Sequence, residues 1–185
     1  MLSLSENPPI LAGPMARTVL DLQGRWWIGH TKSRFEKTLA HKLLQQQVGY
    51  FLPLLPRVTV AGGKKRRSLI PMFPSYVFFC GTPEDRVTAL STKCLCRVLE
   101  VPEQETFVRE LVAIERAMAH ASELEPYPFA AVGRRCRVIG GSFEGVEGIV
   151  VAHKKRARIV LQVSMLRCGA SLEVDADLLE PVDGE

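Results

Sequence analysis

The sequence of 185 residues has no apolar run that approaches the roughly 20 residues needed to cross a bilayer. Its first 24 residues also lack the basic and then apolar order of a signal peptide. They contain Pro8, Pro9 and Pro14 instead, so we expect a flexible arm over residues 1–24. These absences predict a cytoplasmic protein that does not associate with a membrane.

Cysteine is scarce as well. The five cysteines are an odd number with scattered spacing, which argues against a disulfide framework. Cys94 and Cys96 form the only close pair, and neither a second pair nor a histidine stands at the spacing of zinc ligands. We expect reduced thiols, no bound metal and no cofactor.

Enzyme signatures are missing from the chain. Residues 62–66 (GGKKR) lack the first glycine and the Ser/Thr of a phosphate-binding loop. The four histidines are far apart, and the patterns GxSxG and HExxH do not occur. The sequence therefore predicts a protein that is not an enzyme.

Negative charge is sparse in the first half. Residues 25–114 contain 14 Lys/Arg and 7 Asp/Glu, whereas residues 133–185 contain 8 of each. Such a basic module is expected to lie near a polyanion. The candidates for an electrostatic contact with nucleic acid are in the tip of an expected hairpin: Lys64, Lys65, Arg66 and Arg67. A solvated tip is the alternative interpretation.

The first module, over residues 25–122, combines strands with helices. Residues 25–31 have strand composition, and the uninterrupted apolar run at residues 76–80 is typical of the centre of a sheet. Ser33 and Glu36 have the spacing of a capping box for a helix that ends near residue 47.

Two further helices are expected in this module. Thr82 and Pro83 predict the start of a short helix as its cap and first residue. Apolar residues at helical spacing predict another helix over residues 105–122. Together the elements predict an α+β fold.

A linker and a second module follow. Residues 123–131 include Pro126 and Pro128, which cannot continue a helix, and we place the linker there. Short strands separated by turn residues then predict a small β-barrel over residues 132–185.

Two stretches resemble a known family. Residues 133–150 (GRRCRVIGGSFEGVEGIV) look like a KOW motif, and their glycines allow the positive φ angles that such a small barrel needs. Residues 71–79 (PMFPSYVFF) resemble the LFPGYVF strand of the NusG N-terminal domain. In their order along the chain, these features resemble a NusG-type transcription elongation and antitermination factor. The compact hairpin tip is more similar to the specialised RfaH-like paralogues.

The resemblance implies an N-terminal α/β sandwich with a mainly antiparallel sheet, followed by a small SH3-like KOW β-barrel. It also implies a monomeric factor that binds the clamp helices of the large RNA polymerase subunits and suppresses pausing. The matching residues are Phe73, Pro74 and Tyr76, with Trp27 and His30 on or beside the first strand. Because strand faces alternate, a place in the core is the alternative for Phe73 and for Tyr76.

The resemblance implies further partners. Arg86 and Lys93 lie in the stretch that touches the non-template DNA strand in RfaH-like members, although the histidine–threonine pattern of those members is absent here. The resemblance also implies that the KOW barrel recruits a small-subunit ribosomal protein, the termination factor Rho, or both. The matching residues are Met165 and Leu166 at the contact edge and Phe143 at the barrel end.

A KOW-containing RNA-binding or ribosome-associated protein is the alternative function. Co-purification of polymerase subunits favours the first interpretation, and ribosomal subunits alone favour the second. The sequence leaves open whether the factor acts generally or on a few operons, and whether it promotes readthrough or pausing.

Overall fold

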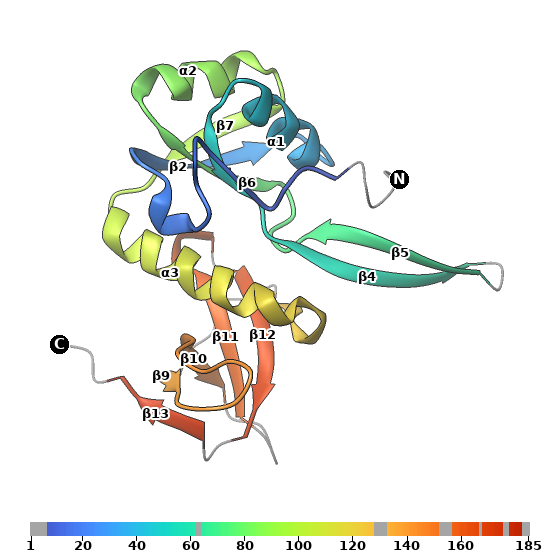
Figure 1. Cartoon of the computed structure of the whole chain (residues 1–185), viewed down its shortest axis with the longest axis vertical. Helices are drawn as coiled ribbons and strands as arrows, with labels where there is room; N and C mark the ends of the chain where they lie inside the picture. Colours follow the sequence, from blue (N-terminus) through green and yellow to red (C-terminus); the bar gives the residue numbers. More distant parts are fainter. Residues whose placement is uncertain are drawn as a thin grey trace. The chain divides into compact units, whose positions relative to one another are not determined.

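A computed structural model of the chain describes residues 7–61, 64–127, 133–151, 157–166, 168–175 and 178–182. The chain forms two compact units, Met1–Glu105 and Thr106–Glu185 (Figure 1). This division falls inside a helix, whereas the sequence placed the boundary at residues 123–131, and those domain limits stay a prediction.

An antiparallel five-stranded sheet forms the centre of the first unit. Its strands follow the order β1-β3-β6-β2-β7, which places the apolar run of β6 in the middle, as predicted. The bounds are β1 (Leu11–Ala12), β2 (Arg25–Thr31), β3 (Gly49–Phe51), β6 (Tyr76–Gly81) and β7 (Leu95–Glu100).

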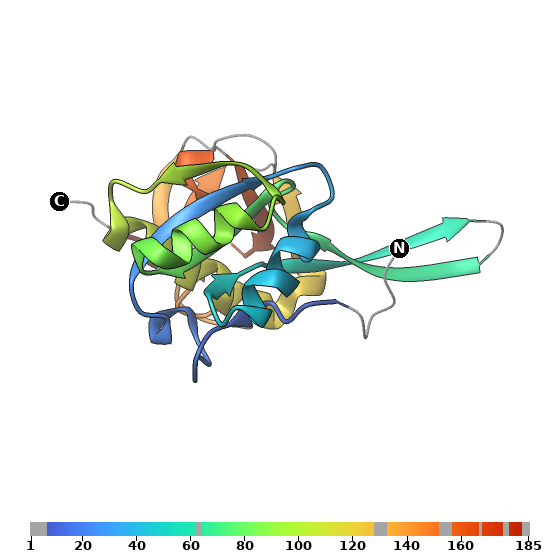
Figure 2. The same ribbon diagram turned by 90° about the horizontal axis from the view of Figure 1, so that it is seen from above.

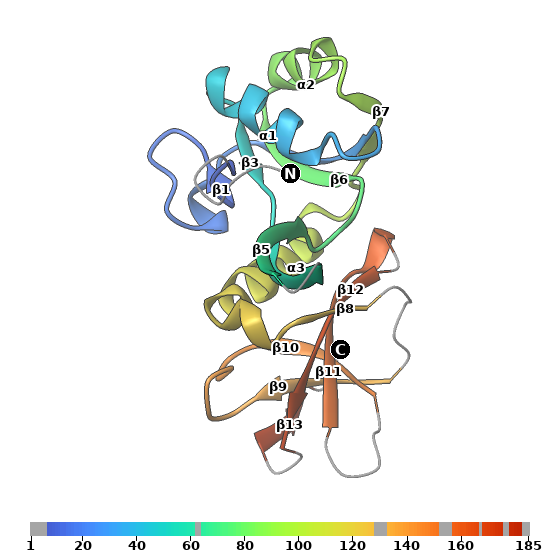
Figure 3. The ribbon, with the colours of Figure 1, turned by 90° about the vertical axis from the view of Figure 1, so that its right-hand side faces the viewer.

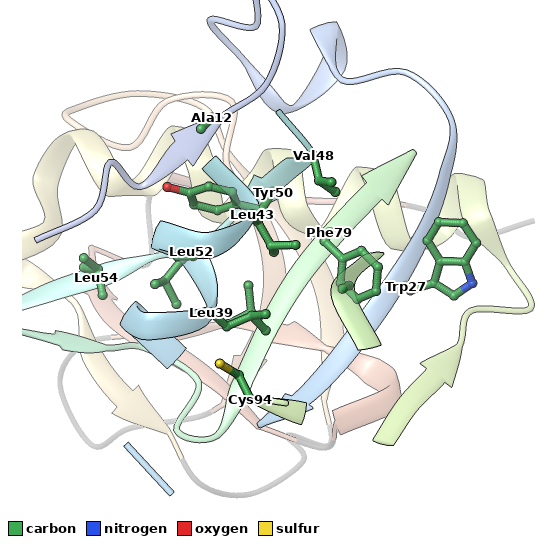
Figure 4. Close-up of a cluster of buried hydrophobic side chains, with 13 residues drawn as sticks. Ala12, Trp27, Leu39, Leu43, Val48, Tyr50, Leu52, Leu54, Phe79 and Cys94 are labelled. Atoms are coloured by element: carbon green, nitrogen blue, oxygen red, sulfur yellow. The ribbon is translucent and has the colours of Figure 1, made fainter. Parts of the chain in front are cut away.

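Helices α1 (Glu36–Gln45) and α2 (Pro83–Ser91) cover one face of this sheet (Figure 2). Their apolar side chains pack with Trp27, Tyr50 and Phe79 in one buried cluster (Figure 4). The rings of Trp27 and Phe79 stack at 5.6 Å between centroids. Burial of these large rings stabilises this unit.

Of the two helix caps predicted from the sequence, the structure contains one and lacks the other. Thr82 caps α2 and forms a capping box with Asp85, which confirms the prediction. The capping box predicted from Ser33 and Glu36 is wrong, because α1 begins at Glu36 after an N-cap residue, Phe35, without a side-chain cap. The Glu36 carboxylate instead accepts a hydrogen bond from a distant backbone amide.

The N-terminal segment differs from the flexible arm expected over residues 1–24. Of its described part, residues 7–24, β1 pairs with β3 at the edge of the sheet. Ala12, Val19 and Leu22 are buried, and Tyr50 Oη donates a hydrogen bond to the carbonyl of Pro9 at 3.0 Å. The segment therefore covers a sheet edge that would otherwise be unpaired.

Gln104, near the end of the first unit, binds back to strand β2. Its side-chain oxygen accepts a hydrogen bond from the Trp26 amide at 2.8 Å, and its Nε2 donates to the Trp26 carbonyl at 3.0 Å. Both backbone groups of a buried strand residue are thus satisfied by one side chain.

A separate two-stranded sheet, β4 (Leu54–Ala61) with β5 (Lys64–Pro71), projects from the first unit (Figure 1). It is the predicted hairpin, but the basic residues are part of β5 and not of the tip alone. Residues 62–63 at the turn lie outside the described residues.

The second unit consists of a helical stretch and an antiparallel six-stranded sheet in the order β13-β9-β10-β11-β12-β8 (Figure 3). The helical stretch is α3 (Gln104–Ala117), whose first two residues belong to the first unit, and η3 (Met118–Glu123). The strands are β8 (Glu125–Tyr127), β9 (Arg134–Val138), β10 (Glu147–Val151), β11 (Ala157–Val163), β12 (Cys168–Val174) and β13 (Leu179–Pro181).

This architecture confirms the predicted α+β class with antiparallel sheets and a KOW-like second domain. Gly141 and Gly145 have φ angles of 80°, as the glycine-rich turn requires. Glu125–Tyr127, inside the stretch expected to be a linker, instead pairs with β12. No helix among the described residues is long and apolar enough to cross a membrane.

Candidate functional site

A turn before β6 carries the residues that resemble the LFPGYVF strand. Its last residue, Ser75, has a left-handed backbone with φ of 68°, which is costly for a residue with a side chain. The Ser75 amide donates to Glu36 Oε1 at 2.7 Å, and its carbonyl accepts from the Thr31 amide at 2.8 Å. Helix α1 and strand β2 therefore hold the turn in place.

Tyr76 and His30 lie side by side next to this turn. They are paired residues of β6 and β2, and their ring centroids are 5.1 Å apart. Both side chains are partly exposed, and Pro74 is exposed beside them. The buried Nδ1 atom of His30 has no hydrogen-bond partner among the described residues. We call His30, Pro74 and Tyr76 the Tyr76 patch.

The other two residues of the predicted polymerase-binding set are in the core. Phe73 is 1% exposed and packs edge-on against Phe78, with centroids 5.2 Å apart. Trp27 is 2% exposed, and its Nε1 donates to Glu100 Oε2 at 3.2 Å. These side chains support the strands that carry the Tyr76 patch but offer no surface to a partner.

The basic hairpin presents cations on accessible strands. Lys65 and Arg67 are exposed, whereas Lys64 and Arg66 are described by their backbone register alone. Arg57 on the opposite strand is also exposed, and the sequence reasoning missed it. Its place in the expected strand, opposite the basic run, was the available signal.

Arg86 and Lys93 differ from each other. The Nε atom of Arg86 lies 3.4 Å from Glu100 Oε1, and Arg25 Nη2 lies 3.2 Å from Glu100 Oε2. Arg86 therefore shares the half-exposed carboxylate of Glu100 with Arg25, and a phosphate would have to compete with this carboxylate. Lys93 is exposed at a left-handed residue with φ of 61° after α2.

The predicted KOW contact residues are also unequal in exposure. Phe143 is 7% exposed, and its ring meets His120 edge-on with centroids 5.1 Å apart. Met165 is 42% exposed in the short helix η4 (Ser164–Leu166), and Leu166 is half-buried. Within this unit the Glu110 carboxylate accepts hydrogen bonds from the amide and hydroxyl of Ser164 and so fixes η4.

The Cys80 thiol is buried in strand β6 of the five-stranded sheet. Burial and the nearby Asp85 raise the pKa of the Cys80 thiol to about 12, so Cys80 stays protonated at neutral pH. No group of three or more His, Cys, Asp or Glu that could hold a metal occurs in the described part of the chain. The arrangement offers surfaces for binding.

The chain is similar to known proteins of one family. The family model of NusG, transcription termination factor nusG, matches residues 24–122. Two proteins named transcription termination/antitermination protein NusG, from Xylella fastidiosa strains Temecula1 and 9a5c, are 30% and 28% identical to the chain. Each alignment covers 83% of this chain and 95% of the relative.

A solved structure of Thermotoga maritima NusG, from work on its domain interaction, has 17% sequence identity and a TM-score of 0.44. The match covers 87% of this chain and 98% of that one. The family model spans more than half of the chain, and the relatives match along almost their full length. The chain belongs to the NusG family of transcription termination/antitermination factors.

Proposed function

We propose that this chain binds the clamp helices of RNA polymerase through the Tyr76 patch and modulates pausing and termination, with antitermination as the outcome. The observation that carries the proposal is the accessible pair of rings, Tyr76 and His30, beside a turn that the fold holds in one conformation.

Physical chemistry favours such a patch as an anchor for helices. Tyrosine combines a large apolar ring with a polar hydroxyl, which suits a surface that loses its water on binding. The Ser75 turn is already fixed by Glu36 and Thr31, so little conformational entropy remains to be lost when a partner docks.

The proposal includes two further contacts, one made by the second unit and one made by the basic residues of the first. Exposed Met165 supports recruitment of a small-subunit ribosomal protein or Rho by the second unit. The basic hairpin supports a contact with nucleic acid, and Lys93 is better placed than Arg86 to reach a phosphate of the non-template strand. The proposed relation to RfaH-like paralogues rests on the compact hairpin tip.

The test is capture of purified core RNA polymerase by the tagged full chain. The variant is Pro74→Ala/Tyr76→Ala, which removes accessible side chains and leaves the buried Phe73 and Trp27 intact. We expect polymerase capture to fall at least about tenfold, because hot-spot aromatic residues are each worth about 2 kcal/mol or more.

The matched control is Val87→Ala, which shortens a 61% exposed apolar side chain on α2, away from the turn. It should capture polymerase like the wild type, and circular dichroism should show that all variants are folded. If the double variant captures polymerase normally, the Tyr76 patch is not the site. If the wild type captures no polymerase but captures purified ribosomal subunits in a parallel assay, the KOW-containing ribosome-associated alternative replaces the proposal.

A further inference from the structure

We propose that the β4–β5 hairpin enters the major groove of B-form duplex DNA and that cations on its two faces contact the two phosphate backbones bordering the groove. The inference rests on the nucleic-acid contact proposed for the hairpin and specifies its form. It does not require polymerase, because the hairpin and the Tyr76 patch share no residue.

The charge of the hairpin is exceptional within this chain. Residues 54–71 contain five Lys/Arg and no Asp/Glu. The whole chain has a net charge of +4, so the residues outside the hairpin sum to −1. The hairpin therefore supplies all of the net positive charge, and attraction to a polyanion is concentrated there.

Cations are present on both faces of the ribbon. Directly paired residues of an antiparallel ladder share a face, and successive residues along a strand alternate. Arg57 pairs with Ser68 on one face, and Arg67 pairs with Val58 on the other. Arg57, Arg67 and Lys65 are exposed, with Lys65 on the face of Arg67.

The remaining two basic residues, Lys64 and Arg66, stand opposite Ala61 and Thr59 at register positions on the face of Arg57. A protein surface that rests on one phosphate backbone needs cations on one face only. Cations on both faces match a ligand that has phosphates on both sides of the ribbon, and a groove of a duplex provides this arrangement.

The dimensions of the hairpin also match. The ribbon is a sheet of its own, and it projects from the rest of the first unit (Figure 2). Residues 57–61 with 64–68 form an outer part about 17 Å long, at about 3.3 Å per residue. The major groove of B-form DNA is about 12 Å wide and about 8.5 Å deep, and it admits a two-stranded ribbon.

The side-chain composition favours duplex DNA over other nucleic acids. Residues 54–71 contain no Phe, Tyr, Trp or His, so they offer no platform on which unpaired bases can stack. Val58 is 57% exposed beside Arg67, and an apolar side chain can contact a thymine methyl group in the major groove. Duplex RNA has a deep and narrow major groove that does not admit the ribbon.

The test measures binding of the full chain to a fluorescein-labelled duplex DNA of about 20 base pairs by anisotropy at several salt concentrations. Two variants each remove two cations from one face: Arg57→Gln/Arg66→Gln and Lys65→Gln/Arg67→Gln. The control, Arg17→Gln/Arg109→Gln, removes two exposed cations outside the hairpin.

We expect each hairpin variant to weaken duplex binding by more than about tenfold at 0.1 M salt. Each should reduce the slope of log K against log salt by about 2, because every phosphate contact contributes about 0.9. The control should leave the slope unchanged, and all variants should still capture polymerase.

Several results would overturn the inference. If only one hairpin variant changes the slope, the ribbon rests on a single backbone. If single-stranded DNA or duplex RNA of the same length binds as tightly as duplex DNA, the hairpin does not bind in the major groove of B-form DNA. Either of those two results would still be consistent with the proposed contact between the hairpin and nucleic acid. If the wild type binds none of the three, the proposed nucleic-acid contact of the hairpin fails as well.

Discussion

The first unit contains two antiparallel sheets that differ in what holds them. In the five-stranded sheet, Tyr50, Phe78 and Phe79 are each 0% exposed. In the outer part of the β4–β5 hairpin, Arg57, Val58, Lys65 and Arg67 are exposed, and the ribbon is a two-stranded sheet. A two-stranded ribbon alone is marginally stable in water, because it has no second layer on which to bury side chains.

From this difference we expect the five-stranded sheet to determine stability and the outer hairpin to determine binding. Substitutions in the five-stranded sheet should lower the free energy of unfolding. Substitutions in the outer hairpin should change the affinity for nucleic acid and leave the free energy of unfolding nearly constant. Four predictions test this division, from the largest expected effect to the smallest.

Phe79→Ala should lower the free energy of unfolding by about 3–5 kcal/mol, since truncation of a buried Phe leaves a cavity that the surrounding core fills only in part. Phe79 stacks on Trp27 in the buried cluster of Figure 4. Urea unfolding followed by tryptophan fluorescence measures the loss. A loss below about 1 kcal/mol would show that this core tolerates repacking. It would also contradict the expected difference in stability contribution between the five-stranded sheet and the hairpin.

Alkaline pH should destabilise the five-stranded sheet through Cys80. Burial raises the pKa of this thiol from 9.0 to about 12, so above pH 9 the unfolded chain loses a proton that the folded chain retains. The contribution of Cys80 to the free energy of unfolding is therefore constant below pH 9 and falls by up to about 1.4 kcal/mol per pH unit as the pH rises towards 12.

Urea unfolding of the wild type and of Cys80→Ala at pH 8, 9 and 10 tests this dependence. The Cys80→Ala variant should keep only the decline that comes from other groups whose pKa burial raises, such as Cys168 and Tyr50. An equal decline in both proteins would show that Cys80 does not control it.

Glu36→Gln should lower the free energy of unfolding by about 1 kcal/mol, because the charge-assisted hydrogen bond from the Ser75 amide becomes a neutral one. Glu36 is 7% exposed, so water does not replace the lost interaction. The same variant should weaken polymerase capture by loosening the turn before Tyr76. Normal stability with normal capture would mean that the turn is held by other contacts.

Val58→Ala should change the free energy of unfolding by less than about 0.5 kcal/mol, since Val58 is 57% exposed and fills no core. Thermal unfolding by circular dichroism provides the measurement. A loss as large as that of Phe79→Ala would contradict the division between the two sheets.

The sequence predicted those elements whose signals are local. The apolar run of residues 76–80 became the central strand, and Thr82 with Asp85 caps α2. These features depend on neighbours along the chain, and a single sequence contains that information. The basic hairpin was found for the same reason.

Elements that depend on distant partners were missed. Leu11–Ala12 is a strand only because β3 lies next to it, and two residues carry no periodicity. Glu125–Tyr127 includes Pro126, which argued for a linker, but β8 is an edge strand, where a proline needs no amide partner.

The site was predicted in part for a similar reason. The resemblance placed Phe73 and Tyr76 together, but the turn at Ser75 sends Phe73 into the core and leaves Tyr76 partly exposed. The turn is held by hydrogen bonds to Thr31 and to Glu36, which is 39 residues away, and no local pattern shows these contacts. The position of Arg57 beside the basic strand likewise depends on strand pairing.

The two hydrogen bonds between the Gln104 side chain and the Trp26 backbone have a consequence for synthesis of the protein. The two residues are 78 positions apart, and Trp26 belongs to β2, one of the inner strands of the sheet. During synthesis on the ribosome, the hydrogen bonds of β2 are complete only after β6, β7 and finally Gln104 have emerged. During this interval its two tryptophans are exposed, so the rate of translation sets how long the nascent chain is open to aggregation.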